Sequence, residues 1–228
     1  MSKQDIKHGE TDSAYEAVMD AIVTQRLAPS QKVSENILSD MFGIRRTASR
    51  NLIERLIAKQ FLVSVSPRVT LVAPLTALEI RQNFTLRKIL MPPVWTQAAS
   101  YVDYDELQAV NEEIKQLQPI EDEDIALQVL KKNKELNLLV YEKTGYPLVL
   151  DWARQLEDTA MRIYWLYIKA NKRSPYTSEQ QGMVLETLRG YEPARIRMAV
   201  HDTLTQIEDR VLNTIFSSKQ FYTQDLRV

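Results

Sequence analysis

One short segment departs from an otherwise helical sequence pattern. The β-branched runs at 61–65 and 69–72 are separated by Ser66-Pro67-Arg68, which predicts a small β-hairpin. Elsewhere apolar residues recur every three or four positions, and glycine is limited to 5 of the 228 residues, a pattern typical of helices. The sequence therefore predicts a mainly α protein that contains one small hairpin.

Three helical segments are predicted ahead of this hairpin. The first begins after a cap at Asp12 or Ser13. The second lies between a Ser34 cap and Gly43, where glycine favours a left-handed helix end. The third covers about 45–59. Helix, helix, turn, helix and hairpin in this order indicate a winged helix-turn-helix fold, in which the third helix reads DNA.

The third helix concentrates positive charge in a chain that is almost neutral. The whole sequence has 29 basic and 30 acidic residues, whereas the segment 44–59 has five basic residues and one acidic residue. Basic and polar side chains at the start of a recognition helix contact bases and phosphates in the major groove. The alternative for any single residue is an ordinary solvated face. The side chains expected to contact DNA are those of Arg45, Arg46, Thr47, Ser49 and Arg50, with Arg68 at the hairpin tip.

Short motifs in this region resemble the N-terminal domain of the GntR family of bacterial transcription regulators. They are Leu27-Ala28-Pro29-Ser30, Val33-Ser34-Glu35-Asn36-Ile37-Leu38 and Gly43-Ile44-Arg45-Arg46-Thr47-Ala48-Ser49-Arg50-Asn51-Leu52. The resemblance implies that Arg46, Thr47 and Arg50 act on the DNA, with Asn36 and Arg45 near its backbone. Val69 stands where the family has a wing-tip glycine, which puts the close approach of the wing in doubt because a β-branched residue adopts positive φ only at a cost.

From about residue 76 onward the pattern is helical, with breaks at proline and glycine. We expect a winged helix-turn-helix domain at 1–73, a linker with the start of the next helix at 74–80, and an all-helical domain at 81–228. The acidic run Glu121–Asp124 is expected to cap a helix, although by composition alone it could suggest a metal site.

The helical half resembles the FCD type of effector domain. The matching segments are Leu78-Glu79-Ile80-Arg81 through Arg87, Asn133-Lys134-Glu135-Leu136-Asn137 with Gly145-Tyr146-Pro147, and Val184-Leu185-Glu186-Thr187-Leu188 through Thr203-Leu204. In many members of that subfamily an Asp and a His four residues apart, together with two later His, bind a divalent metal beside a small carboxylate effector. The corresponding positions here are Asn133, Asn137, Gln181 and either His201 or Thr203, so the resemblance implies that this metal site is lost.

The chemistry of these residues agrees, because neutral amide and hydroxyl oxygens do not offset the dehydration of a transition metal. Asn133 and Asn137 share one helical face and could bind a neutral or carboxylate-bearing ligand, or satisfy one another and trapped water. Arg87 could pair with a ligand carboxylate or form a helix–helix or interdomain ion pair. His201 and Thr203 point about 200° apart around a helix, so only one of them can face a pocket.

Composition excludes several classes of protein. The chain has no cysteine and two histidines, which excludes thiol chemistry and all-histidine metal centres within one chain. No nucleophile–base set or phosphate-binding glycine loop is recognisable, so we do not expect an enzyme. No uncharged run is long enough to cross a bilayer.

We therefore expect a cytoplasmic, homodimeric transcription regulator, a repressor, that binds double-stranded operator DNA and a small-molecule effector, with a carboxylate as one candidate, and that has no metal cofactor. The alternative is a small all-α enzyme or metabolite-binding protein whose N-terminal module serves only protein interaction.

Overall fold

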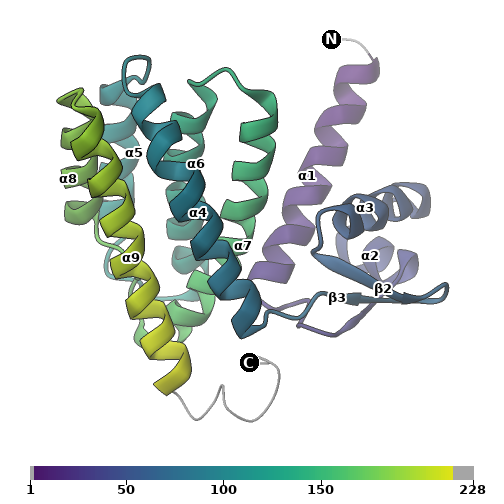
Figure 1. Cartoon of the computed structure of the whole chain (residues 1–228). Coiled ribbons are helices and arrows are strands. Elements are labelled where there is room, and N and C mark those ends of the chain that lie inside the picture. Colours follow the sequence, from purple (N-terminus) through teal and green to yellow (C-terminus); the bar gives the residue numbers. More distant parts are fainter. Residues whose placement is uncertain (1–2, 218–228) are drawn as a thin grey trace. The chain divides into compact units, whose positions relative to one another are not determined.

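The computed structural model describes residues 3–217, with side chains from residue 13 onward. It divides into two compact units, with the boundary between Leu75 and Thr76. Within the described residues the N-terminal unit contains three helices and a three-stranded sheet, and the C-terminal unit contains six helices (Figure 1). This is a winged helix-turn-helix followed by an all-helical bundle, which confirms the predicted fold class.

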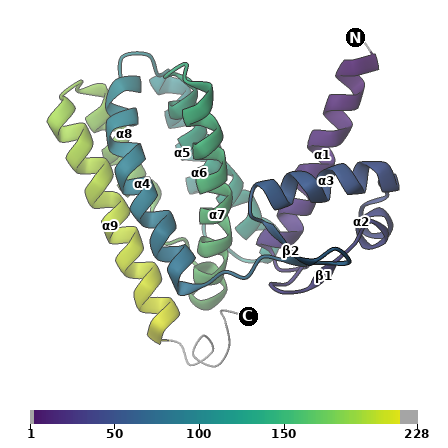
Figure 2. The same cartoon turned by 45° about the vertical axis from the view of Figure 1, so that its right-hand side comes forward.

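The N-terminal unit has the predicted element order with one additional strand (Figure 2). Strand β3 is central and pairs antiparallel with both β1 and β2. Sequence analysis missed β1 because two residues are too few to show an alternating pattern. The elements are α1 (Lys3–Val23), β1 (Lys32–Val33), α2 (Glu35–Phe42), α3 (Arg46–Ala58), β2 (Leu62–Ser66) and β3 (Val69–Val72).

Both predicted ends of α2 are confirmed. The Ser34 hydroxyl accepts a hydrogen bond from the Ile37 backbone N–H at 3.2 Å. Gly43 closes the helix with φ of 66°, the left-handed region that glycine enters without a Cβ clash. The turn between α2 and α3 is therefore fixed by local chemistry.

Helix α1 begins earlier than predicted. It starts at Lys3 and continues through Ser13, so Ser13 is not its cap, while the side chain of Asp12 lies outside the described residues. An Asp or Ser inside a helix costs only a few tenths of a kcal/mol, about 0.7 at most, so neither residue is enough to start or end a helix at its position. Val18 and Ile22, which lie four residues apart on one side of the helix, are buried in the core of this unit.

The C-terminal unit is a bundle in which α4 packs along α9 and α6 packs along α7. Its helices are α4 (Ala77–Ala98), α5 (Tyr104–Gln116), α6 (Glu123–Glu142), α7 (Pro147–Asn171), α8 (Ser178–Arg189) and α9 (Pro193–Ser217). Helix α4 begins at the unit boundary with a capping box, in which Thr76 and Glu79 each bond the backbone N–H of the other.

The acidic run before α6 has the predicted structural role. The Asp122 carboxylate caps the helix by accepting from the Ile125 N–H at 2.8 Å, and Glu123 and Asp124 occupy the first turn, where the helix dipole favours negative charge. Residues 162–168 of α7, a segment rich in aromatic side chains, are all buried. None of the described helices is both long enough and apolar enough to cross a membrane.

Candidate functional site

The first candidate site is the N-terminal end of α3. Arg45 is its N-cap residue with an extended backbone, and its side chain makes no capping bond. The side chains of Arg46, Thr47 and Arg50 are exposed, and their spacing of three and four residues places them on one side of the helix. The first backbone N–H groups of a helix add a partial positive charge at the same end, which favours phosphate. This end of α3 therefore presents a cationic surface with several hydrogen-bond donors.

Ser49 does not belong to this surface, contrary to the sequence prediction. It is fully buried, and its Oγ donates to the Arg45 carbonyl oxygen at 3.3 Å. The physical reason is periodicity, because Ser49 lies three residues before Leu52 and seven before Leu56, which form the buried stripe of α3. A small side chain here lets α3 pack closely against its own unit.

The basic residues at the end of α3 are used inside the unit. The Arg55 guanidinium lies 4.1 Å from the centroid of the Tyr15 ring on α1, and Lys59 Nζ lies 5.8 Å from the same centroid. These contacts have cation–π geometry and join α3 to α1. Arg50 Nε pairs with Glu54 Oε1 at 3.2 Å, but both side chains are largely exposed, so this pair holds Arg50 only weakly.

The remaining predicted DNA contacts are also on the surface. Asn36 is exposed in the first turn of α2, and Arg68 is exposed between β2 and β3, with its backbone N–H donating to Ser66 Oγ at 3.4 Å. Val69, at the position of the wing-tip glycine, starts β3 and pairs with Ser66. Residues 67–68 therefore form the turn without a positive φ at Val69.

The second candidate site is a cavity of about 40 Å³ within the helical bundle. Helices α4, α6, α7, α8 and α9 all contribute to its wall, together with Tyr176 from the segment before α8. The predicted pocket residues that line it are Arg87, Asn133, Asn137, Gln181 and Thr203. His201 does not line the cavity, since its side chain is 53% exposed and its Nδ1 lies 3.5 Å from Asp202 Oδ1. The helical angle between residues 201 and 203 explains why only Thr203 points inward.

Arg87 is held at the cavity wall by α7. Its Nη2 donates to Glu157 Oε1 at 3.0 Å, and its Nη1 donates to the Tyr164 hydroxyl. Arg87 is 2% exposed and Glu157 is 1% exposed, so this is a buried ion pair within the C-terminal unit. Of the roles that the sequence left open for Arg87, the structure shows a helix–helix ion pair.

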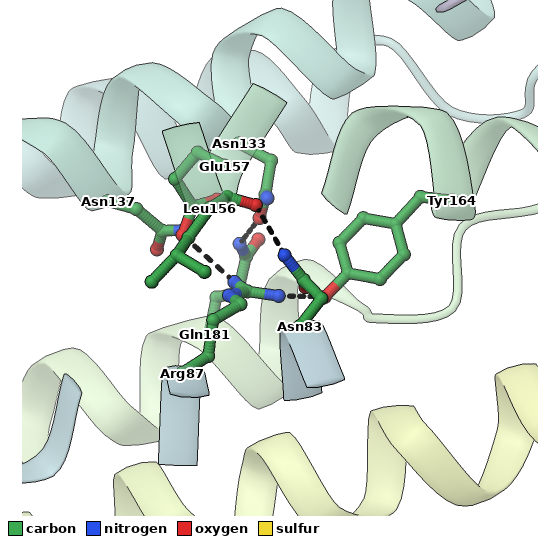
Figure 3. A network of polar contacts seen from close by, with 8 residues as sticks. All are labelled: Asn83, Arg87, Asn133, Asn137, Leu156, Glu157, Tyr164 and Gln181. Carbon is green, nitrogen blue, oxygen red and sulfur yellow. Dashed lines mark hydrogen bonds and ion pairs between the residues drawn. The ribbon is translucent and has the colours of Figure 1, made fainter. Parts of the chain in front are cut away.

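The amide side chains extend this network across the cavity (Figure 3). Asn137 Nδ2 donates to Glu157 Oε2 at 3.0 Å, so both carboxylate oxygens have partners. Gln181 Nε2 donates to Asn133 Oδ1 at 2.6 Å. Asn133 and Asn137 thus bond to α8 and α7, and the structure shows no bond between them.

Burial and charge shift the pKa values of the network in the direction that keeps it intact. Burial lowers the pKa of Arg87, whereas Glu157 and the two neighbouring tyrosines raise it. Their combined effect is larger, so the pKa of Arg87 lies above its usual value. Burial raises the pKa of Tyr164 and of Tyr176. Arg87 therefore stays charged and both tyrosines stay neutral across the physiological pH range.

Sequence reasoning missed Glu157 and Tyr164. One signal was available, because Glu157 interrupts the buried stripe that runs through Ala153, Ala160 and Tyr164 on α7. An acidic residue on an apolar helical face indicates a buried partner of opposite charge. The sequence does not identify that partner, since Arg87 lies 70 residues away.

The residues at the positions of the subfamily's metal ligands do not fit a divalent transition metal. Asn133, Asn137, Gln181 and Thr203 provide only neutral amide and hydroxyl groups, and the nearby carboxylate of Glu157 is already bound by Arg87 and Asn137. Among the described residues no group of three or more His, Cys, Asp or Glu is arranged to hold a metal ion.

No protein-family sequence model and no curated sequence matches this chain. Solved structures do match. E. coli McbR/YncC aligns with a TM-score of 0.74 at 18% identity, over 89% of this chain and 97% of that chain.

Two further structures align over similar lengths. A putative transcriptional regulator GntR from Rhodococcus sp. RHA1 gives a TM-score of 0.68 at 14% identity, over 90% of this chain and 98% of that chain. A GntR family transcriptional regulator from Pseudomonas syringae pv. tomato str. DC3000 gives 0.52 at 19% identity, over 90% and 86%. This chain therefore has the fold of proteins described as GntR transcriptional regulators over most of its length, which confirms the resemblance at the level of the fold.

Proposed function

We propose that this protein is a sequence-specific DNA-binding transcription regulator. The observation that carries the proposal is the exposed set Arg45, Arg46, Thr47 and Arg50 at the start of α3, the recognition helix of a winged helix-turn-helix. In this fold the N-terminal residues of that helix meet base edges in the major groove. Asn36 and Arg68, both exposed, supply further contacts to the DNA, Asn36 to the backbone and Arg68 to the adjacent groove or backbone.

The protein acts as a homodimer on a pseudo-palindromic operator. A single winged helix presents only a few base contacts, which give too little specificity for one genomic site. Two copies related by a two-fold axis read two half-sites of a symmetric operator.

A small molecule in the cavity controls operator binding. The protein is a cytoplasmic repressor, and it has no resident divalent metal. Support comes from α4, which starts at the unit boundary with Thr76 and contributes Arg87, Met91 and Trp95 to the cavity wall. A ligand that contacts these residues acts on the helix that directly follows the DNA-binding unit. The ligand changes the affinity for DNA only to the extent that it binds the DNA-bound and the DNA-free arrangements of the protein with different affinities.

The DNA-binding proposal is tested with variants of Arg46 and Arg50. Double-stranded DNA is first selected from a random pool with the wild-type protein. We expect Arg46→Ala and Arg50→Ala each to weaken binding to the selected DNA by about 1–3 kcal/mol, because alanine cannot bond a base or a phosphate through its side chain. Where the replaced arginine binds a phosphate, the slope of log K against log salt should fall by about one.

The control is Arg197→Ala, which removes an exposed arginine of the C-terminal unit with the same change in charge. Its isotherm should match that of the wild type. Equal binding by all four proteins at matched salt, or failure to select any DNA, would refute α3 as the reading helix.

A further inference from the structure

The cavity holds a fixed positive charge that the protein itself neutralises. Among the described residues that line the cavity, Arg87 is the only one with a charge. Glu157 on α7 does not line the cavity, and its Oε1 lies 3.0 Å from Arg87 Nη2. Asn137 engages the second oxygen of the same carboxylate. An internal carboxylate thus already neutralises the charge that would otherwise recognise a carboxylate ligand.

The cavity also contains polar atoms that have no partner. Arg87 Nε, Trp95 Nε1 and Gln181 Oε1 are buried and make no hydrogen bond to any residue that the structure describes, and all three residues line the cavity. Arg87 and Trp95 are both more than nine-tenths buried. Two donors and one acceptor of residues in the cavity wall are therefore left without a partner inside the protein. An unpaired buried polar group is costly, so a molecule that pairs with these atoms is stabilised there.

We infer that the cavity binds a small neutral molecule with both a hydrogen-bond acceptor and a donor, such as a primary amide, and discriminates against a carboxylate of the same shape. The inference deepens the proposed function, since it names the class of effector for that site. An anionic ligand would have to displace Glu157 from Arg87 or add an uncompensated charge to a neutral, buried site. A neutral amide loses less hydration and can pair with both kinds of unpartnered atom. The volume of about 40 Å³ limits the occupant to a few heavy atoms.

Acetamide and acetate form a matched pair of probes, because they have nearly the same shape and differ in charge. Each is titrated into the full-length protein at pH 7 and constant ionic strength. The readout is the Trp95 indole N–H resonance in a proton–nitrogen correlation spectrum, which Trp95→Phe identifies among the three tryptophans of the chain. We expect acetamide to shift this resonance with an affinity at least about tenfold higher than that of acetate.

The Glu157→Gln variant releases Arg87 from its internal carboxylate. In this variant the preference should reverse, so that acetate binds more tightly than acetamide by about tenfold. The matched control is Asp158→Asn, which makes the same carboxylate-to-amide change at the neighbouring buried residue. Asp158 pairs with Lys134 and does not line the cavity, so this variant should keep the wild-type preference.

Three outcomes would overturn the inference: acetate binding to the wild type as tightly as acetamide, neither probe moving the Trp95 resonance, or Asp158→Asn reversing the preference as Glu157→Gln does. If the spectrum of Glu157→Gln shows an unfolded protein, the comparison of the two probes on the wild type decides. These measurements use no DNA. Failure of operator binding would therefore count against the proposed function alone, and failure of the probe comparison against the ligand class alone.

Discussion

Arg87 depends on a single carboxylate for its place in the bundle. Removing Glu157 leaves a guanidinium buried without its counter-charge, and breaking a buried pair in this way typically costs about 3–5 kcal/mol. We expect Glu157→Ala to lower the free energy of unfolding of the C-terminal unit by this amount. Urea denaturation followed by tryptophan fluorescence measures it.

The double variant Arg87→Met with Glu157→Leu is the control. Replacing both members of a buried pair with apolar residues of similar volume is often close to neutral. The double variant should therefore recover most of the stability that Glu157→Ala removes. If both proteins are equally destabilised, the loss comes from packing and the ion pair has no special role.

Ser49 belongs to the packing face of α3 and not to the exposed surface that contains Arg46 and Arg50. We expect Ser49→Ala to leave affinity for the selected DNA unchanged, because the side chain faces the core. Ser49→Leu should overpack the same place and lower the free energy of unfolding of the N-terminal unit by about 1–3 kcal/mol. Binding isotherms and chemical denaturation followed by circular dichroism test the two effects. A loss of DNA affinity in a folded Ser49→Ala protein would show that the Ser49 side chain does contact the DNA.

At the scale of elements, the turn before α3 depends on one backbone conformation. Gly43 has φ of 66°, and an added Cβ would meet no heavy atom within 4 Å. Gly43→Ala should therefore cost about 1–2 kcal/mol through backbone strain alone. Gly190 is the matched control, because its φ of −71° suits any residue and its Cβ would make only ordinary contacts. Gly190→Ala should leave stability nearly unchanged, and equal losses in both variants would contradict the account.

The elements that local chemistry defines were predictable from the sequence. Ser34 and Gly43 bound α2, Asp122 caps α6, and the β-branched runs form the hairpin, because in each case the residues that fix the structure lie within a few positions of one another. The pocket residues on α4, α6 and α8 were reached only through resemblance to a family, which compares positions that are distant in the chain.

Features that depend on tertiary contacts were not predictable. Strand β1 exists because β3 offers it an edge, and two residues have no period of their own. The donor count on α3 suggested that Ser49 faces DNA, whereas the packing of Leu52 and Leu56 determines its orientation. Glu157 pairs with Arg87 across 70 positions of sequence, and no local pattern identifies such a partner.

At the scale of the whole molecule, each unit has its own buried core, and the units are expected to unfold in separate steps. All three tryptophans follow residue 75, so their fluorescence reports on the C-terminal unit, while circular dichroism reports on both. We expect Gly43→Ala to move a transition seen by circular dichroism without moving the fluorescence transition. Glu157→Ala should move the fluorescence transition. A single coincident transition that both variants shift equally would show that the two units unfold together.

The buried pair of Arg87 and Glu157 also has a consequence for how such sequences diverge. A sequence in which only one of the two residues has been replaced encodes a destabilised protein. The two positions are therefore expected to change together during evolution or not at all. In a set of related sequences, an arginine at the first position should be accompanied by an acid at the second. A sequence that keeps the arginine but lacks the acid would need another source of negative charge, and an anionic ligand is one such source. This pair of positions can therefore be used to sort relatives by the charge of the molecule that they bind.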